Sequence, residues 1–419
     1  MDELLHDRFR RLERIEAPDL WNEAVGRAAE MELARRRTFT PTMALIAFGL
    51  LLAALAGTIA VGTWLDRETP SPVRVEYENG WLTAKAGCGV VGIDPTSFES
   101  RELVSGDSDC ELPEFASFDS VAWSADGRWL AYLEPALTSP QTSESSAIWL
   151  YDAEDGEARP VGTCPGYCGA IDISPDGSLL SFGIGDGIAV KEIEGGAQHE
   201  LEVIGLSSSP TFSPDGRQLL FTVSGGQTGV HVVDVAEVMQ GVATGPTLVG
   251  RIVAAWDPIW SPDGTWIAFG QESAIRDPQS GTAYCCSDTT TSLWVVHPDG
   301  TGARQLTPTD LAQPIRPPTW SPDSTSIAFL SAGDTEESVA LWSVGIDGGP
   351  ATRIYESGCC VDDLRSPAWS PDGAWISFGV HLNGRPDESG TVLIRPDGSD
   401  AQMASTQVFD PVWQAIPAD

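Results

Sequence analysis

A short motif recurs six times along the chain, at intervals of roughly 40 to 60 residues. Each copy has an apolar pair, Ser-Pro-Asp-Gly or a close variant, and a second apolar run, as in PIWSPDGTWIAFG at 258–270. The other copies begin at Val121, Ile171, Pro210, Pro318 and Pro367. Because Pro presets one turn residue and Gly accepts a positive φ, each copy predicts a β-hairpin with a tight turn.

A second hairpin is predicted after each motif. Examples are IWLYDAEDGEARPV at 148–161, LWVVHPDGTGARQLT at 293–307 and LWSVGIDGGPATRI at 341–354, each with its own Asp/Gly turn. The repeating unit is therefore four antiparallel strands. Repeats of this length predict a β-propeller, in which each blade needs its neighbours to bury its two faces.

The two ends of the repeat region predict a seventh blade made of two pieces. DPVW at 410–413 matches DPIW at 257–260, and residues 78–104 supply the three strands that this fragment lacks. We therefore predict an all-β, seven-bladed propeller over 78–419 that the C-terminal strand closes. A six-bladed ring is the alternative.

Residues 38–65 contain no charged side chain, and their core reads MALIAFGLLLAALAGTIAVG. About twenty apolar residues suffice to span a bilayer, so we predict a transmembrane helix over 38–65, with its span near Thr42–Leu65. The Arg35–Arg37 run in front of it places the N-terminus in the cytoplasm and the repeats outside. A cleaved signal peptide is the competing interpretation, but the leader is too long and too acidic for that class.

Residues 1–37 show apolar residues at helical spacing on both sides of Pro18. This pattern predicts a helical cytoplasmic leader, which either binds a cytoplasmic partner or serves as a spacer that sets the topology. Residues 66–77 form a short linker that contains proline. Together these segments predict a single-pass protein integral to the cell membrane, with an extracytoplasmic propeller.

Charge and motif content exclude several functions. The formal net charge is −36, from 24 basic and 60 acidic residues, whereas nucleic-acid binding requires a basic surface. The sequence has no Gly-x-Ser-x-Gly, no His-Glu-x-x-His and no phosphate-binding loop, and its five histidines are scattered. We therefore expect no enzyme activity, no cofactor and no resident metal.

The repeated PxWSPDGxxIAF unit resembles the WD-like repeats of the TolB family over residues 78–415. TolB proteins are soluble periplasmic partners of envelope proteins and carry a small α/β domain before the propeller. This resemblance implies a propeller that binds a protein or another envelope ligand. The arginine-rich leader before a single span also resembles the layout of bacterial anti-sigma factors, which implies an alternative role as a transmembrane regulator whose propeller senses.

Six residues precede predicted innermost strands and are candidates for binding a ligand or partner at one mouth of the channel. They are Asp119, Trp256, Asp257, Arg316, Arg365 and Asp410. The two arginines are unusual in so acidic a chain, and they either grip an anionic group or pair with neighbouring carboxylates.

All eight cysteines are assigned by the four-strand unit to loops on the face opposite the Ser-Pro-Asp-Gly turns. They are Cys88, Cys110, Cys164, Cys168, Cys285, Cys286, Cys359 and Cys360. Outside the cytoplasm disulfides persist, and proximity favours Cys88–Cys110 and Cys164–Cys168, with the two vicinal pairs joined to each other. We therefore predict that this cysteine-bearing face meets the partner.

Overall fold

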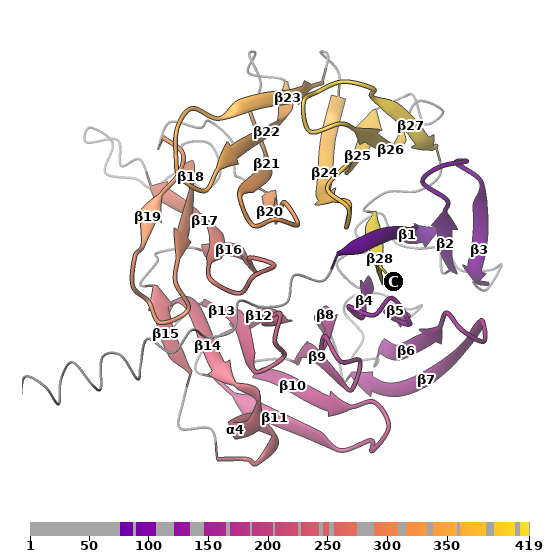
Figure 1. The fold of residues 1–419 in the computed structure, drawn as a ribbon. Coiled ribbons are helices and arrows are strands. Elements are labelled where there is room, and N and C mark those ends of the chain that lie inside the picture. Colours follow the sequence, from indigo (N-terminus) through magenta and orange to yellow (C-terminus); the bar gives the residue numbers. More distant parts are fainter. Residues whose placement is uncertain are drawn as a thin grey trace, which may run out of the picture. The chain divides into compact units, whose positions relative to one another are not determined.

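The computed structural model contains seven four-stranded antiparallel sheets arranged as the blades of a ring (Figure 1). All described residues belong to the unit Val75–Asp419. The structure describes residues 76–86, 89–105, 121–134, 146–164, 168–184, 187–203, 206–224, 228–242, 246–250, 255–274, 289–308, 316–332, 338–357, 361–382, 389–406 and 411–418. The predicted all-β, seven-bladed propeller is confirmed, and the six-bladed alternative is wrong.

In the first four blades, the strands are ordered from the centre of the ring outwards as they occur in the sequence. The exception is blade 1, whose innermost strand comes from the C-terminal segment. Blade 1 contains β28 (Val412–Pro417), β1 (Tyr77–Ala86), β2 (Gly89–Ile93) and β3 (Ser100–Val104). Blade 2 contains β4 (Val121–Trp123), β5 (Trp129–Glu134), β6 (Ser146–Asp152) and β7 (Glu157–Cys164). Blade 3 contains β8 (Cys168–Ile173), β9 (Leu179–Ile184), β10 (Gly187–Glu192) and β11 (Gln198–Glu202). Blade 4 contains β12 (Leu206–Phe212), β13 (Gln218–Ser224), β14 (Gly229–Asp234) and β15 (Thr247–Gly250).

The last three blades repeat this order from the centre of the ring outwards. Blade 5 contains β16 (Ala255–Trp260), β17 (Ile267–Ala274), β18 (Thr289–Val296) and β19 (Arg304–Gln305). Blade 6 contains β20 (Arg316–Trp320), β21 (Ser326–Ala332), β22 (Val339–Gly345) and β23 (Thr352–Glu356). Blade 7 contains β24 (Val361–Trp369), β25 (Ile376–Leu382), β26 (Gly390–Ile394) and β27 (Gln402–Ser405).

The ring is closed by pairing between strands from the two ends of the repeat region. Strand β28 runs antiparallel to β1, with Trp413 opposite Leu82 and Pro417 opposite Tyr77. The buried Trp413 packs in the same apolar cluster as Leu82 and Leu393, so β28 joins blade 1 to blade 7. Closure by the C-terminal strand, predicted from the DPVW match, is confirmed.

The Ser-Pro-Asp-Gly turn is held by the side chains that the motif repeats. In blade 5 the Ser261 hydroxyl donates to Asp263 over 2.6 Å and accepts the backbone N–H of Trp266 over 2.9 Å. Gly264 follows with a φ of +70°, which glycine adopts without a steric penalty. The motif thus satisfies its own polar groups locally, which explains why the same turn recurs in blades 2 to 7.

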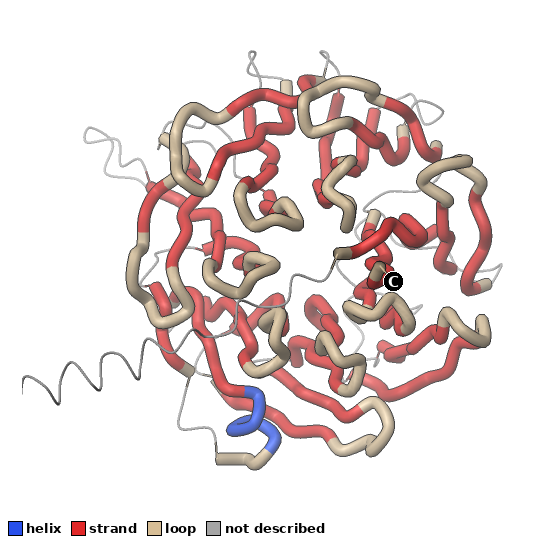
Figure 2. Tube along the Cα trace, viewed as in Figure 1, coloured by secondary structure: helices blue, strands red, loops and turns tan. Residues whose placement is uncertain are grey.

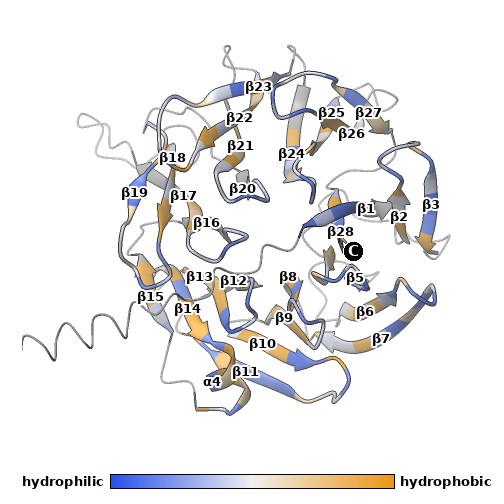
Figure 3. Cartoon of the chain, in the orientation of Figure 1, coloured by the Kyte–Doolittle hydropathy of each residue, from blue (hydrophilic) through white to orange (hydrophobic). Residues whose placement is uncertain are grey.

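The core lies between neighbouring blades. Four second strands contribute a fully buried phenylalanine, namely Phe182, Phe221, Phe329 and Phe378. One apolar cluster combines Leu150 of blade 2 with Ile173 and Leu180 of blade 3. Middle strands such as β10 and β14 are mostly hydrophobic, whereas the outermost β11 is hydrophilic (Figure 3), so each blade completes the core of the next.

The described helix, α4 (Val235–Met239), follows β14 and is capped by Asp234, whose side chain accepts two backbone N–H groups. No helix in the described ranges is long and apolar enough to span a membrane. The predicted leader (1–37), transmembrane helix (38–65) and most of the linker (66–77) lie outside those ranges, so these remain predictions.

Candidate functional site

The two mouths of the ring differ in what borders them. In blades 2 to 7 the innermost strand runs toward a turn that connects it to the second strand, and these turns gather around the centre of the ring (Figure 2). We call this end the turn mouth. Because the strands alternate in direction, the links from second to third strands and from one blade to the next lie at the opposite end.

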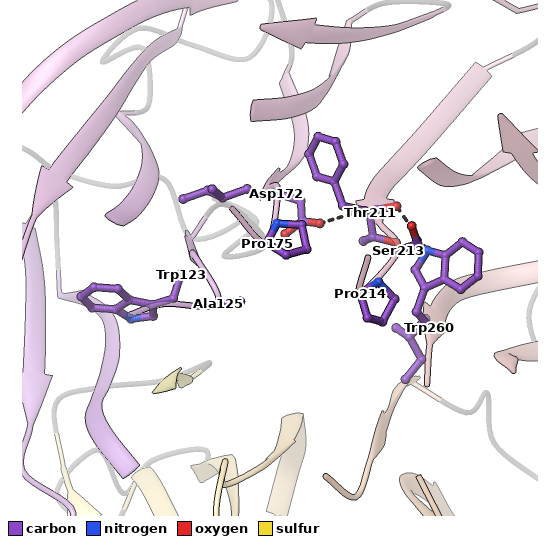
Figure 4. Close-up of a pocket in the computed structure, with 11 residues that line it drawn as sticks. Trp123, Ala125, Asp172, Pro175, Thr211, Ser213, Pro214 and Trp260 are labelled. Atoms are coloured by element: carbon purple, nitrogen blue, oxygen red, sulfur yellow. Dashed lines mark hydrogen bonds between the residues drawn. The ribbon is translucent and has the colours of Figure 1, made fainter. Parts of the chain in front are cut away.

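A cavity of about 290 Å³ lies where blades 2 to 5 meet at the turn mouth. The aromatic rings of Trp123 and Trp260 line it, with Asp172 and Thr211 between them (Figure 4). The remaining lining residues are Ala125, Ile173, Pro175, Phe212, Ser213, Pro214 and Ile259. The repeated motif therefore supplies most of the wall, and the residues that vary between repeats supply its polarity.

The Asp172 carboxylate is the charged group of this cavity. It is half-buried on β8, and its Oδ2 accepts the backbone N–H of Phe212 on β12 over 2.8 Å. Burial raises the pKa of Asp172 from 3.8 to about 7, while hydrogen bonds from the N–H groups of Phe212 and Ile173 lower it less. Among the described residues, none forms a salt bridge with Asp172.

The hydroxyl of Thr211 is the second polar feature. Its Oγ1 is buried and has no hydrogen-bond partner among the described residues. The backbone oxygen of Thr211 accepts the indole N–H of Trp260 over 3.4 Å, and the indole N–H of Trp123 donates to Thr83 over 2.8 Å. The indole N–H is the single side-chain donor of tryptophan, and in both residues it is bonded within the protein. Their rings therefore line the cavity as apolar walls.

The cavity contains few titratable groups. Asp172 is its single titratable side chain among the eleven lining residues. Across the described ranges, no three His, Cys, Asp or Glu side chains gather as metal ligands do. The lining presents a carboxylate, a hydroxyl and aromatic surface, which are groups that can recognise a ligand.

The predicted ligand-binding residues lie toward the opposite mouth, so far as the structure describes them. Trp256, Arg316 and Arg365 each stand four residues before the aromatic residue of the motif, in the adjacent strands β16, β20 and β24. The sequence placed these residues before the innermost strands, but they lie within them. The reason is that the pairing with the second strand continues on the N-terminal side of a β-bulge and includes these residues. Arg365 is half-buried and already has an interaction partner.

The other predicted positions are described less fully. Asp257 is in β16 and only its backbone is described, as for Trp256 and Arg316, whereas Asp119 and Asp410 lie outside the described residues. Whether these side chains form one site stays a prediction.

Two of the eight cysteines lie within the described residues, at the ends of the strands that flank one link between blades. Cys164 ends β7 and is buried, and Cys168 begins β8, across the link from one blade to the next. The other six, Cys88, Cys110, Cys285, Cys286, Cys359 and Cys360, lie outside the described residues. The proposed disulfides therefore stay predictions.

Sequence reasoning missed Asp172 and Thr211, although one signal was available. One innermost-strand position precedes the motif aromatic, or Ile173 in blade 3, and stands opposite an equivalent second-strand residue in all seven blades. It holds Ala122, Asp172, Thr211, Ile259, Thr319, Ala368 or Val412. Asp172 is the charged exception in this set. An exception at one position of a repeat indicates a role that the shared fold does not require.

Comparison with known proteins gives the fold and a distant relative. No family profile matches the chain. The chain is similar to the "Uncharacterized peptidase YuxL" of Bacillus subtilis, with 25% identity over 224 residues that cover 43% of this chain and 33% of the relative. The chain thus spans about a third of the length of this curated relative.

Solved structures with the same fold include enzymes, such as a gluconolactonase. The periplasmic gluconolactonase PpgL of Pseudomonas aeruginosa matches with a TM-score of 0.54 and 16% identity, covering 81% of this chain and 99% of that one. A putative TolB from Agrobacterium tumefaciens matches with a TM-score of 0.45 and 18% identity, covering 66% of this chain and 92% of that one. The match to PpgL shows that the chain shares the β-propeller fold, and proteins of this fold differ in activity.

Proposed function

We propose that this protein is a non-enzymatic binding module, anchored in the membrane by residues 38–65 with its propeller outside the cytoplasm. The observation that carries the proposal is the cavity at the turn mouth, where Asp172 and Thr211 interrupt an aromatic and proline-lined wall. A small cavity with a few placed polar groups is typical of ligand sites. Acid–base catalysis generally needs a second titratable or nucleophilic group beside the first, and this lining supplies one carboxylate.

The turn mouth is favoured over the cysteine-bearing face as the binding surface. Around the turn mouth, rigid hairpin turns hold the lining residues in place, as the bonds of Ser213 to Asp215 and to the Gln218 N–H illustrate. A preorganised surface loses less conformational entropy when a ligand binds.

Site-specific photocrosslinking in intact cells tests the proposal and compares the two mouths. A benzophenone amino acid at Ala125, which lines the cavity, is compared with the same group at Trp256 on β16, toward the opposite mouth. We expect a discrete adduct from position 125 and none from position 256. Adducts from position 256 alone would place binding at the opposite mouth. The absence of adducts from both positions would contradict the proposal that the protein is a binding module.

The regulator alternative depends on the leader, which lies outside the described residues. Its support is the sequence pattern of helical, arginine-containing segments before a single apolar stretch. A pull-down with residues 1–37 separates the two roles. Recovery of a sigma factor supports a transmembrane regulator, whereas an empty bait leaves the outer binding module alone.

A further inference from the structure

A single charged residue stands at a position that is neutral in every other blade. Asp172 occupies the innermost strand two residues before the motif serine, where Ile173 replaces the aromatic residue of the other blades, and it stands opposite Ser181 on β9. In blade 6 the same position holds Thr319, whose hydroxyl accepts the backbone N–H of Trp369 in the next blade over 3.3 Å. A neutral hydroxyl therefore suffices for the link between blades, so the fold alone does not explain a carboxylate here.

The charge of Asp172 has no counter-ion in the described part of the chain. No lining residue of the cavity is basic, and the influences on the Asp172 pKa are burial and two backbone N–H groups, without a cation. Asp172 has backbone N–H partners, but holding a half-buried carboxylate charged without a counter-ion is still costly. A cation that enters the cavity would remove this cost.

The polar groups left to a ligand are oxygen atoms. Asp172 lines the cavity and uses Oδ2 for the Phe212 N–H, while the indole donors of Trp123 and Trp260 are already occupied. The Thr211 Oγ1 is shielded from solvent, so the carboxylate is the group that meets a ligand. A ligand group that carries several N–H donors and positive charge fits such a lining. Tryptophan rings also attract cations through their π-faces, most strongly where water is excluded.

We propose that the cavity at the turn mouth binds a cationic nitrogen group, an ammonium or a guanidinium, with Asp172 as its counter-ion. This inference rests on the proposed function and names the chemistry of the ligand. The cavity volume of about 290 Å³ lies at the low end for ligand pockets, so it receives one group of a ligand. The net charge of −36 adds a field that draws cations toward the protein.

Binding of small probes to the full-length protein tests the inference. The probes are n-butylammonium and n-butylguanidinium, with 1-butanol as the neutral counterpart, followed by saturation-transfer NMR and calorimetry. We expect both cations to bind at least tenfold more tightly than the alcohol. Asp172→Asn should abolish this preference. Glu200→Gln is the matched control, because Glu200 is an exposed carboxylate on the outermost strand of the same blade.

A second pair of probes separates a free amine from a basic side chain of a protein partner. A blocked Gly-Gly-Lys-Gly-Gly peptide is compared with its Nε-acetylated form and with n-butylammonium. Tighter binding of the lysine peptide assigns the cation to a polypeptide, and tighter binding of the small amine assigns it to a free metabolite. Equal binding of charged and neutral probes, or full binding by Asp172→Asn, would overturn the inference. Crosslinking from position 125 that persists in that case would leave the proposed function standing.

Discussion

The side-chain amide of Gln414 donates a hydrogen bond of 2.6 Å to the backbone oxygen of Gly127 in blade 2. The same amide accepts the backbone N–H of Trp81 in blade 1 over 2.9 Å. Gln414 stands where the other blades have the motif serine. One side chain of the closing strand therefore links its own blade to the next.

Gln414→Ala should destabilise the closed ring. The substitution leaves two backbone groups, the Trp81 N–H and the Gly127 carbonyl, without their partner, and each such group costs about 1–3 kcal/mol when buried. We expect the free energy of unfolding to fall by about 2–4 kcal/mol. Chemical denaturation measures this change. Gln402→Ala, at an exposed position of β27, is the control and should change stability little; an equal loss in both variants would contradict the role of Gln414.

Ala328→Ser should stabilise the protein. The indole N–H of Trp413 donates to the Ser377 hydroxyl over 3.0 Å, and that of Trp123 donates to Thr83. Ala328 holds the equivalent second-strand position facing Trp369, whose indole N–H is buried without a partner. A serine there supplies the missing acceptor, so we expect a gain of about 1 kcal/mol in thermal or chemical unfolding.

The matched control for Ala328→Ser is Ala131→Ser in blade 2. Ala131 packs in a cluster with Ile173 of the next blade, and isoleucine has no side-chain donor. The added hydroxyl should be buried without a partner there and cost about 1–3 kcal/mol. Changes of opposite sign in the unfolding free energy of the two variants would confirm that a second-strand hydroxyl stabilises the fold by accepting the indole N–H of the next blade. Equal changes would refute this.

Ser324→Gly should be more stable than Ser324→Ala. Ser324 occupies the turn position that is glycine in the other Ser-Pro-Asp-Gly motifs, and its φ is +60°. Both variants lose the hydrogen bond from the Asp263 N–H to the Ser324 hydroxyl, so this loss cancels in the comparison. Only alanine keeps the left-handed strain, which costs about 1–2 kcal/mol. Denaturation midpoints that fall in the reverse order would show that this strain is absent.

Asp172→Asn should remove a specific pH dependence of stability. Because the folded pKa of about 7 lies above the ordinary value of 3.8, the folded state holds more protons than the unfolded state between these values. The contribution of Asp172 therefore falls as the pH rises from about 4 to 7. Asparagine keeps an acceptor for the Phe212 N–H without the charge.

The measurement is the difference in unfolding free energy between parent and Asp172→Asn at a series of pH values. Between pH 4 and 7 the unfolding free energy of the variant should rise relative to that of the parent. Above pH 8 the difference between the two should stay constant. Taking the difference cancels the opposite slope from turn carboxyls such as Asp263, whose pKa is lowered by hydrogen bonds. A flat difference would mean that Asp172 titrates as an exposed carboxyl does.

The blades could be predicted from sequence because their determinants are local. Ser261, Asp263 and Gly264 form their turn within a few residues, and the closing strand repeats a motif that the chain carries elsewhere. The cavity could not be predicted in this way. Asp172 and Thr211 meet across two blades, and their hydrogen bonds depend on how neighbouring strands pack.

Closure by β28 also sets an order of events during synthesis. Trp81 and its partner Gln414 are separated by 333 residues, so at about 5–20 residues per second the ribosome needs on the order of 15 to 70 s to make the second after the first. Throughout that interval the inner edge of β1 has no partner strand. Unpaired edges favour association with other chains, so the newly made protein is most vulnerable to misassembly just before its last strand arrives.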